Sequence, residues 1–420
     1  MKRGAAKRIT VLIASFVIVS AALIQPAASA STGTRIPTQY AAVSFPTRYQ
    51  GFVVAYSHCR IQTPAGAEIR LVCTGYLLHT PDGGASWRSY RLRMHVDAVN
   101  FVNASDGWAV ASQGYGTADY HPGAGLYRTR DGGRTWTLQL HEAGRYSIAG
   151  FHLLNPSAGW VMVRRFSLSE GYEGAGRVFE TSDAGRIWRR VSIGDLFVTG
   201  YGAVGTRFRW ATAQISQLQP SAAAPYCCPV SHPGPTYRNA LYVSDDAGRS
   251  WSKVLDVPGG RMGTMLVAFP NARDGRVLTT SGQPNCSMGG CYPTSFWTTA
   301  NGGRTWAVKR VLPRDWSGFP DGIKFSSPSD GWVVFNAGAG PGAGGVAETS
   351  TRGRHWTRSL PCDRYLASTS LAVTGPRSAW LAEQNQCNVV LSHGITVPAS
   401  AVLHTVDAGH HWRSFTPKAG

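Results

Sequence analysis

One eight-residue motif occurs seven times along the chain and limits the folds that the chain can adopt. The motif reads Ser/Thr-x-Asp-x-Gly-x-x-Trp, and we call it the box. Successive boxes lie roughly fifty residues apart, a period typical of stacked or radially arranged units. The third and eighth residues of the seven boxes are Asp82 and Trp87, Asp131 and Trp136, Asp183 and Trp188, Asp246 and Trp251, Asn301 and Trp306, Thr351 and Trp356, and Asp407 and Trp412.

Each box is expected to form the turn of a β-hairpin. The residues before and after it, such as 125–128 and 136–140, look like strand ends. The Asp side chain can accept hydrogen bonds from backbone N–H groups of the turn. The fifth residue is Gly in all seven boxes, as a positive φ would require. The Trp is expected to cover the turn and to pack on the strands beneath it.

A second motif alternates with the box, and we call it the aromatic turn. It consists of an apolar residue, a short polar turn and an aromatic residue that opens a strand. Clear copies span 101–108, 154–160 and 325–332, and weaker ones span 45–52, 205–210, 269–276 and 373–380.

Two hairpins per period give a four-stranded antiparallel unit, and seven such units predict an all-β, seven-bladed β-propeller. With the strands called A to D in chain order, the aromatic turn joins A to B and the box joins C to D. The expected blades are 41–92, 97–140, 147–191, 199–255, 263–311, 321–360 and 369–416. The ring can close by packing, by a strand from 31–40, or by both.

The boxes resemble the Asp-box, or bacterial neuraminidase, repeat of sialidases, sortilin-type receptors and xyloglucanase-type glycosidases. Their alternation with aromatic turns looks most like the photosystem II assembly-factor family of seven-bladed propellers and its non-photosynthetic bacterial relatives. The resemblance covers 41–416. It implies a structural role for the boxes on the blade periphery and leaves the function open.

The N-terminal segment indicates export. A basic start, an apolar run from Ile9 to about Ile24 and the small residues at 28–30 fit a signal peptide over residues 1–30. The alternative is an uncleaved anchor. Residues 31–40 would form an extension and 41–420 the propeller, with no membrane span in the mature chain. We therefore expect a protein that is secreted or associated with the cell envelope, and a monomer.

Eight cysteines behind a signal peptide indicate disulfides. Local pairing would give Cys59–Cys73, Cys286–Cys291 and Cys362–Cys387, and leaves the partners of the adjacent Cys227 and Cys228 open. The cysteines lack the spacing of a zinc site. We expect neither a metal nor a cofactor.

The formal net charge of +18 favours anionic partners. Arginine occupies the sixth position of five boxes and would form a basic rim: Arg134, Arg186, Arg249, Arg304 and Arg354. The expected partner is a protein or an anionic polymer of the cell envelope. Nucleic acid is excluded by export and by the absence of a recognised reader motif.

Binding is expected on the face that carries the B–C and D–A loops, because these loops are long and irregular while the other turns are short and regular. The candidate binding residues are the aromatic side chains of these loops: Tyr115, Tyr120, Tyr172, Tyr226, Tyr292, Trp316 and Tyr365.

Two other functions compete with that of a non-catalytic binding protein. A glycoside hydrolase, xyloglucanase-like or sialidase-like, would need two carboxylates across a cleft. No pair is singled out by spacing among the loop-face acidic residues Glu142, Glu170, Glu173, Asp315, Asp321, Asp363 and Glu383. Arg35-Ile36-Pro37 matches a sialidase element, but no acidic residue follows it before Glu68. The third possibility is an adhesive or structural envelope protein.

Overall fold

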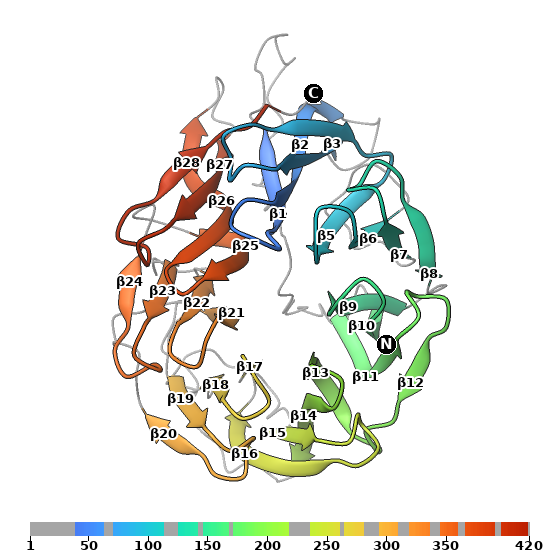
Figure 1. Ribbon diagram of the computed structural model, residues 1–420, viewed down its shortest axis with the longest axis vertical. Helices are drawn as coiled ribbons and strands as arrows, with labels where there is room; N and C mark the ends of the chain where they lie inside the picture. Colours follow the sequence, from blue (N-terminus) through green and yellow to red (C-terminus); the bar gives the residue numbers. More distant parts are fainter. Residues whose placement is uncertain are drawn as a thin grey trace, which may run out of the picture.

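Twenty-eight β-strands build the part of the chain that the computed structural model describes. The described residues are 38–62, 70–112, 125–141, 146–167, 171–217, 236–260, 264–280, 294–309, 319–336, 345–359, 366–390 and 396–418. Their strands form seven four-stranded antiparallel sheets in a ring, which is a seven-bladed β-propeller, as predicted (Figure 1). Within these ranges no helix has the length and apolarity needed to cross a membrane.

Each blade is a continuous stretch of chain whose strands follow the spatial order A-B-C-D from the centre outward. Blades one to three comprise β1 (Gln39–Ser44), β2 (Gly51–Gln62), β3 (Arg70–Thr80) and β4 (Arg88–Arg91); β5 (His95–Phe101), β6 (Gly107–Ser112), β7 (Gly125–Thr129) and β8 (Thr137–His141); and β9 (Tyr146–Leu153), β10 (Gly159–Ser167), β11 (Gly171–Thr181) and β12 (Arg189–Val191). Blades four and five comprise β13 (Phe197–Val204), β14 (Phe208–Gln217), β15 (Thr236–Ser244) and β16 (Ser252–Gly260); and β17 (Met265–Ala268), β18 (Gly275–Thr280), β19 (Thr294–Thr299) and β20 (Ala307–Lys309). Blades six and seven comprise β21 (Phe319–Phe325), β22 (Gly331–Asn336), β23 (Gly345–Thr349) and β24 (Thr357–Ser359); and β25 (Leu366–Gly375), β26 (Ser378–Val390), β27 (Thr396–Thr405) and β28 (Arg413–Phe415).

Four B–C connections differ from the irregular loops that the sequence suggested. In the first, third, fourth and seventh blades the B and C strands continue as paired ribbons, so that β2 runs to Gln62 and β26 to Val390. In the first blade the ribbon resumes after a register shift between Ser57 and Arg60, where His58 has a φ of 52°. A single bulge can absorb such a break and let the ladder continue.

The apolar core lies between blades. Seven clusters of buried side chains each draw on two neighbouring sheets, so that every junction in the ring has its own cluster. At the junction of blades two and three, fully buried Trp108 packs against the start of β10. A Cβ on Gly159 there would lie 2.5 Å from the Trp108 ring, so this close approach requires glycine.

The ring closes by packing of the first blade on the last, without exchange of a strand between them in the described residues. Tyr40 N donates to Ser400 Oγ at 2.7 Å, and Val43 N donates to Ser370 Oγ at 3.1 Å. The rings of Phe45 and Trp380 stack with centroids 4.1 Å apart. Residues 31–37 of the N-terminal extension lie outside the described ranges.

Candidate functional site

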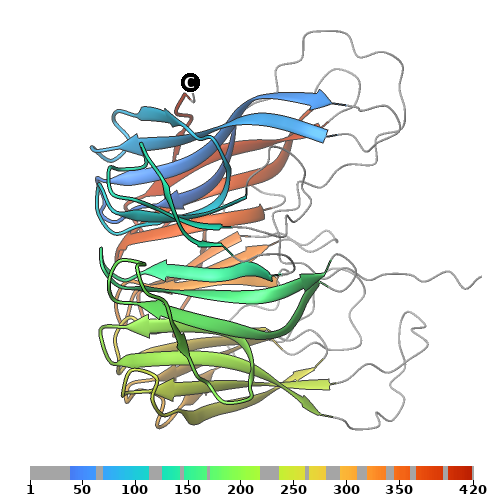
Figure 2. The same cartoon turned by 90° about the vertical axis from the view of Figure 1, so that its right-hand side faces the viewer.

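The two faces of the ring carry different connections. The A–B and C–D turns lie on one face, which we call the turn face, and the strand ends that lead into the B–C and D–A connections lie on the other, the loop face (Figure 2). In every blade the N–H of the fourth box residue donates to a carbonyl of the A–B turn at 2.7–3.0 Å, as Gly83 does to Tyr49. The turn face is therefore a regular surface that repeats one hydrogen bond seven times.

Within each box, side-chain oxygens accept hydrogen bonds from backbone N–H groups of the turn. In the second box Thr129 Oγ1 accepts from Gly133 N at 2.8 Å and donates to Asp131 Oδ1 at 2.8 Å. Asp131 also accepts from the N–H of Thr135 at 2.9 Å and from its hydroxyl at 2.6 Å. In the fourth box the equivalent bonds from Ser250 hold the pKa of the Asp246 carboxyl below its ordinary value.

Two boxes that lack the carboxylate keep part of this network. Asn301 Oδ1 accepts from Thr305 N at 3.0 Å, and Asn301 Nδ2 donates to the Thr305 hydroxyl at 2.9 Å. In the sixth box Thr351 Oγ1 accepts from His355 N at 2.8 Å. All seven turns therefore have a side-chain oxygen acceptor at the third position, and the fold tolerates loss of its charge.

The side chains of all seven aromatic residues predicted to bind a partner lie outside the described part of the chain. Tyr172 lies in β11, but its side chain is outside the described part of the chain. The other six lie outside the described residues altogether: Tyr115, Tyr120, Tyr226, Tyr292, Trp316 and Tyr365. Their role remains a prediction.

One of the three predicted disulfides lies in the described part of the chain and is confirmed. Cys59 and Cys73 are bonded across β2 and β3. Their Cα atoms are 4.0 Å apart, and the bond links the end of β2 to the start of β3, next to the B–C connection of the first blade. Cys387 lies in β26 with its side chain not described. The remaining cysteines fall outside the described ranges: Cys227, Cys228, Cys286, Cys291 and Cys362.

The A strands line the centre of the ring (Figure 1), and six of the seven carry a one-residue register shift. Bulges of this kind redirect a side chain and are common beside functional sites. At each shift the A strand contains one residue more than the paired B strand. Two of these extra residues, Asp97 and Asp321, are acidic and exposed. The full set of extra residues is Ala41, Asp97, Ala149, Thr199, Asp321 and Ser368.

Sequence reasoning named Asp321 but missed Asp97. Each lies four residues before the Phe that begins an aromatic turn, Phe101 or Phe325, and this shared spacing is the signal that could have paired them. The other acidic candidates of the loop face are either outside the described residues or, like Glu173 and Glu383, have side chains that are not described.

Ionisable side chains of the inner strands have shifted pKa values. Half of the Asp97 side chain is exposed, yet the protein around it raises its pKa to about 7 by desolvation. Desolvation by the surrounding protein, with a contribution from the Lys324 ammonium, lowers the pKa of His152 to about 4, although the residue is exposed. Lys324 Nζ donates to the carbonyl of Leu371 in the next blade. Among the described residues no group of three or more His, Cys, Asp or Glu side chains could hold a metal ion.

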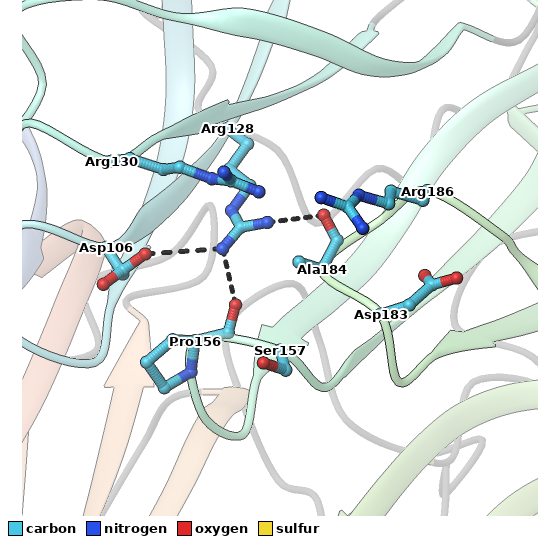
Figure 3. Close-up of a pocket in the computed structure, with 8 residues that line it drawn as sticks. All are labelled: Asp106, Arg128, Arg130, Pro156, Ser157, Asp183, Ala184 and Arg186. Carbon is cyan, nitrogen blue, oxygen red and sulfur yellow. Dashed lines mark hydrogen bonds and ion pairs between the residues drawn. The ribbon is translucent and has the colours of Figure 1, made fainter.

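A pocket of about 430 Å³ opens on the turn face between the second and third blades (Figure 3). Arg128, at the end of β7, and Arg130, in the second box, line it from the second blade. Asp183 and Arg186, both in the third box, line it from the third blade. Sequence reasoning named Arg186 only as part of a basic rim and did not foresee the pocket.

Comparison with known proteins supports the propeller fold but does not assign the chain to a family. The sequence matches no protein-family model and no curated protein. Among solved structures, an acylaminoacyl peptidase from Pyrococcus horikoshii has a TM-score of 0.51 at 8% identity; the match covers 90% of this chain and 52% of the peptidase, so this chain spans about half of it. A GH74 enzyme from Niastella koreensis has a TM-score of 0.37 at 11% identity, with 92% and 74% covered. An alpha-L-arabinanase from Penicillium chrysogenum has a TM-score of 0.40 at 10% identity, with 90% and 99% covered. At these identities the likeness concerns the fold alone.

Proposed function

We propose that this protein is a secreted, non-catalytic propeller that binds a protein or a glycan of the cell envelope on its loop face. The observation that carries the proposal is the difference between the two faces. The turn face repeats one bonded pair of short turns in all seven blades. The strand ends on the loop face lead into connections whose length and composition differ from blade to blade in the sequence, such as 113–124, 218–235 and 337–344. Variable loops on a rigid scaffold are the usual place of recognition.

Three further properties support export and an anionic partner. The Cys59–Cys73 disulfide is typical of proteins from an oxidising compartment. Residues 1–30 have the composition of a signal peptide. The formal net charge of +18 becomes +14 without the four basic residues of segment 1–30, and it raises the local concentration of acidic polymers around the protein. The alternation of box and aromatic turn supports a relationship to the photosystem II assembly-factor-like propellers, which we include in the proposal.

A loop-replacement experiment tests this function. The segments 113–124 and 218–235 are replaced together by short Gly-Ser linkers, and retention of the protein on the envelope fraction of the producing cell is compared with that of the wild type. We expect retention to fall at least about tenfold if the loops supply the principal contacts. A control variant carries Ala272→Ser at an exposed position in the A–B turn of the fifth blade, on the opposite face, and its retention should be unchanged. Equal retention of all three proteins would favour an adhesive surface without a discrete site.

A glycoside hydrolase is the second candidate, because the inner strands hold two exposed carboxyl groups on opposite sides of the ring. Asp97 belongs to the second blade and Asp321 to the sixth (Figure 1). A carboxyl with a pKa near 7 has the property required of a general acid. Release of reducing sugar from envelope glycans by the wild type, and its loss in both Asp97→Asn and Asp321→Asn, would establish the hydrolase and contradict the non-catalytic proposal.

A further inference from the structure

The pocket on the turn face is built around one buried arginine. The Arg128 side chain is 6% exposed. Its Nη1 donates to the carbonyl of Ala184 at 2.6 Å, and its Nη2 donates to the carbonyl of Pro156 at 2.6 Å and to Asp106 Oδ1 at 3.3 Å (Figure 3). These acceptors come from both blades, so the guanidinium is fixed at the junction.

Two more guanidinium groups extend toward Arg128 from opposite sides of the pocket. Arg130 and Arg186 are exposed, and among the described residues their side chains form no hydrogen bond or ion pair (Figure 3). Burial lowers the pKa of Arg128, and the positive charges of Arg130 and Arg186 lower it further. The three cations therefore repel one another, and two of them have unused donors.

The acidic residues of the pocket do not neutralise the charges of Arg130 and Arg186. Asp106 is engaged by Arg128 and by Asn103 Nδ2 at 3.1 Å. Asp183 is held within its own box by the Thr181 hydroxyl at 2.8 Å and the Ile187 N–H at 2.9 Å. The three arginines and these two aspartates leave a formal charge of +1 on the lining residues.

Other blade junctions show that the fold does not demand this cluster. Arg128 directly precedes the first residue of its box. The residues at this position in the seven blades are His79, Arg128, Glu180, Val243, Thr298, Glu348 and His404. At the position of Arg130 the blades carry Pro81, Arg130, Ser182, Asp245, Ala300, Ser350 and Val406. Only the second blade has a basic residue at both positions, and the third and sixth blades have a glutamate in place of Arg128.

We propose that this pocket binds a phosphate group, either as free inorganic phosphate or as a phosphodiester of an anionic polymer. Planar guanidinium groups bind phosphate oxygens through paired N–H donors. The free donors of Arg130 and Arg186 would bind oxygens on two sides of the phosphate. The fixed positive charge of Arg128 would attract the phosphate without donating a hydrogen bond to it. The pocket opens on the turn face, so this proposal is independent of binding on the loop face.

Titration calorimetry at one ionic strength, about 0.15 M, tests the proposal with two probes, sodium phosphate and a glycerol phosphate oligomer. We expect the wild type to bind at least one of them, and Arg130→Ala/Arg186→Ala to raise its Kd about tenfold or more. The control, Arg249→Ala/Arg304→Ala, removes the same charge from boxes of other blades and should change Kd less than about twofold.

The pattern of binding separates the two sources of phosphate. Binding of both probes supports a site for the free ion, and binding of the oligomer alone supports a site for the polymer. Failure of the wild type to bind either probe, or an equal loss of affinity in the two double variants, would overturn the proposal. Because all four arginines are exposed, we expect both variants to fold.

Discussion

Arg209 of the fourth blade and Glu180 of the third form a bidentate ion pair across their junction, with Nε 2.5 Å from Oε1 and Nη2 3.2 Å from Oε2. The Arg209 side chain is 7% exposed, and Tyr201 donates its hydroxyl to the same carboxylate at 2.7 Å. Breaking such a pair on one side leaves an uncompensated charge in a poorly solvated place. The pair therefore stabilises this junction only as a unit.

Arg209→Met should lower the free energy of unfolding by about 3 kcal/mol, because the Glu180 carboxylate, only 21% exposed, would lose its charged partner. The double variant Glu180→Gln/Arg209→Met should recover much of that loss. Equilibrium denaturation in urea measures both. Similar losses in the single and double variants would show that the charge of Glu180 is not the cause. Lys253→Ala, which removes an exposed partner of Asp256, should leave the unfolding midpoint unchanged.

Glu348 should make the protein less stable as the pH rises. Its side chain is buried between the sixth and seventh blades, and burial, together with the charge of Asp330, raises its pKa from 4.5 to about 7. Between these two values the unfolded chain has lost the proton while the folded chain retains it, so the free energy of unfolding falls with rising pH.

Glu348→Gln should consequently stabilise the protein at pH 8, by up to about 3 kcal/mol at about 1.4 kcal/mol per pKa unit, and change little at pH 4. Thermal unfolding at the two pH values measures the difference. An equal effect of the substitution at both would contradict the assigned pKa shift.

The fourth position of the box has a positive φ in every blade, including four blades without glycine there. Ala247 has a φ of 63°, a conformation that costs about 1 kcal/mol for a residue with a Cβ. Ala247→Gly should therefore be neutral or stabilising by up to about 1 kcal/mol, although glycine also gains freedom in the unfolded chain.

The fifth position provides the contrast. A Cβ on Gly133 would lie 2.1 Å from Leu77 Cδ2, and its φ is 88°. Gly133→Ala should therefore destabilise by more than about 1 kcal/mol. A stability change for Ala247→Gly as unfavourable as that for Gly133→Ala would show that the two positions are not distinguished by φ and steric contact.

The sixth box offers a test of the missing carboxylate. Thr351 Oγ1 accepts from His355 N at 2.8 Å, in the place of an Asp oxygen in other boxes. Thr351→Asp should stabilise by about 1 kcal/mol, since the N–H donor is already aligned. Thr351→Ala should destabilise by a similar amount, and urea denaturation compares the two. No difference between the variants would mean that this bond adds nothing to stability.

The number and order of the blades could be predicted, because each blade contains one box and one aromatic turn in its own stretch of sequence. Glycine at the fifth box position and the following tryptophan mark the C–D hairpin locally, so seven copies give seven sheets. The extension of β2 and β26 into paired ribbons could not be foreseen, since it depends on a bulge that leaves no distinct residue pattern. The arginine pocket was also missed, because it forms from two boxes 50 residues or so apart that meet only when neighbouring blades pack.

Footprinting of the protein bound to the envelope fraction tests the central claim, that recognition takes place on the loop face. Hydroxyl-radical labelling is followed residue by residue with and without the envelope fraction. The proposal predicts protection of Tyr115, Tyr120, Tyr226 and Tyr292, and unchanged labelling of Tyr49, which is 51% exposed in a turn of the opposite face. Protection of Tyr49 with unchanged labelling of the four loop tyrosines would contradict it.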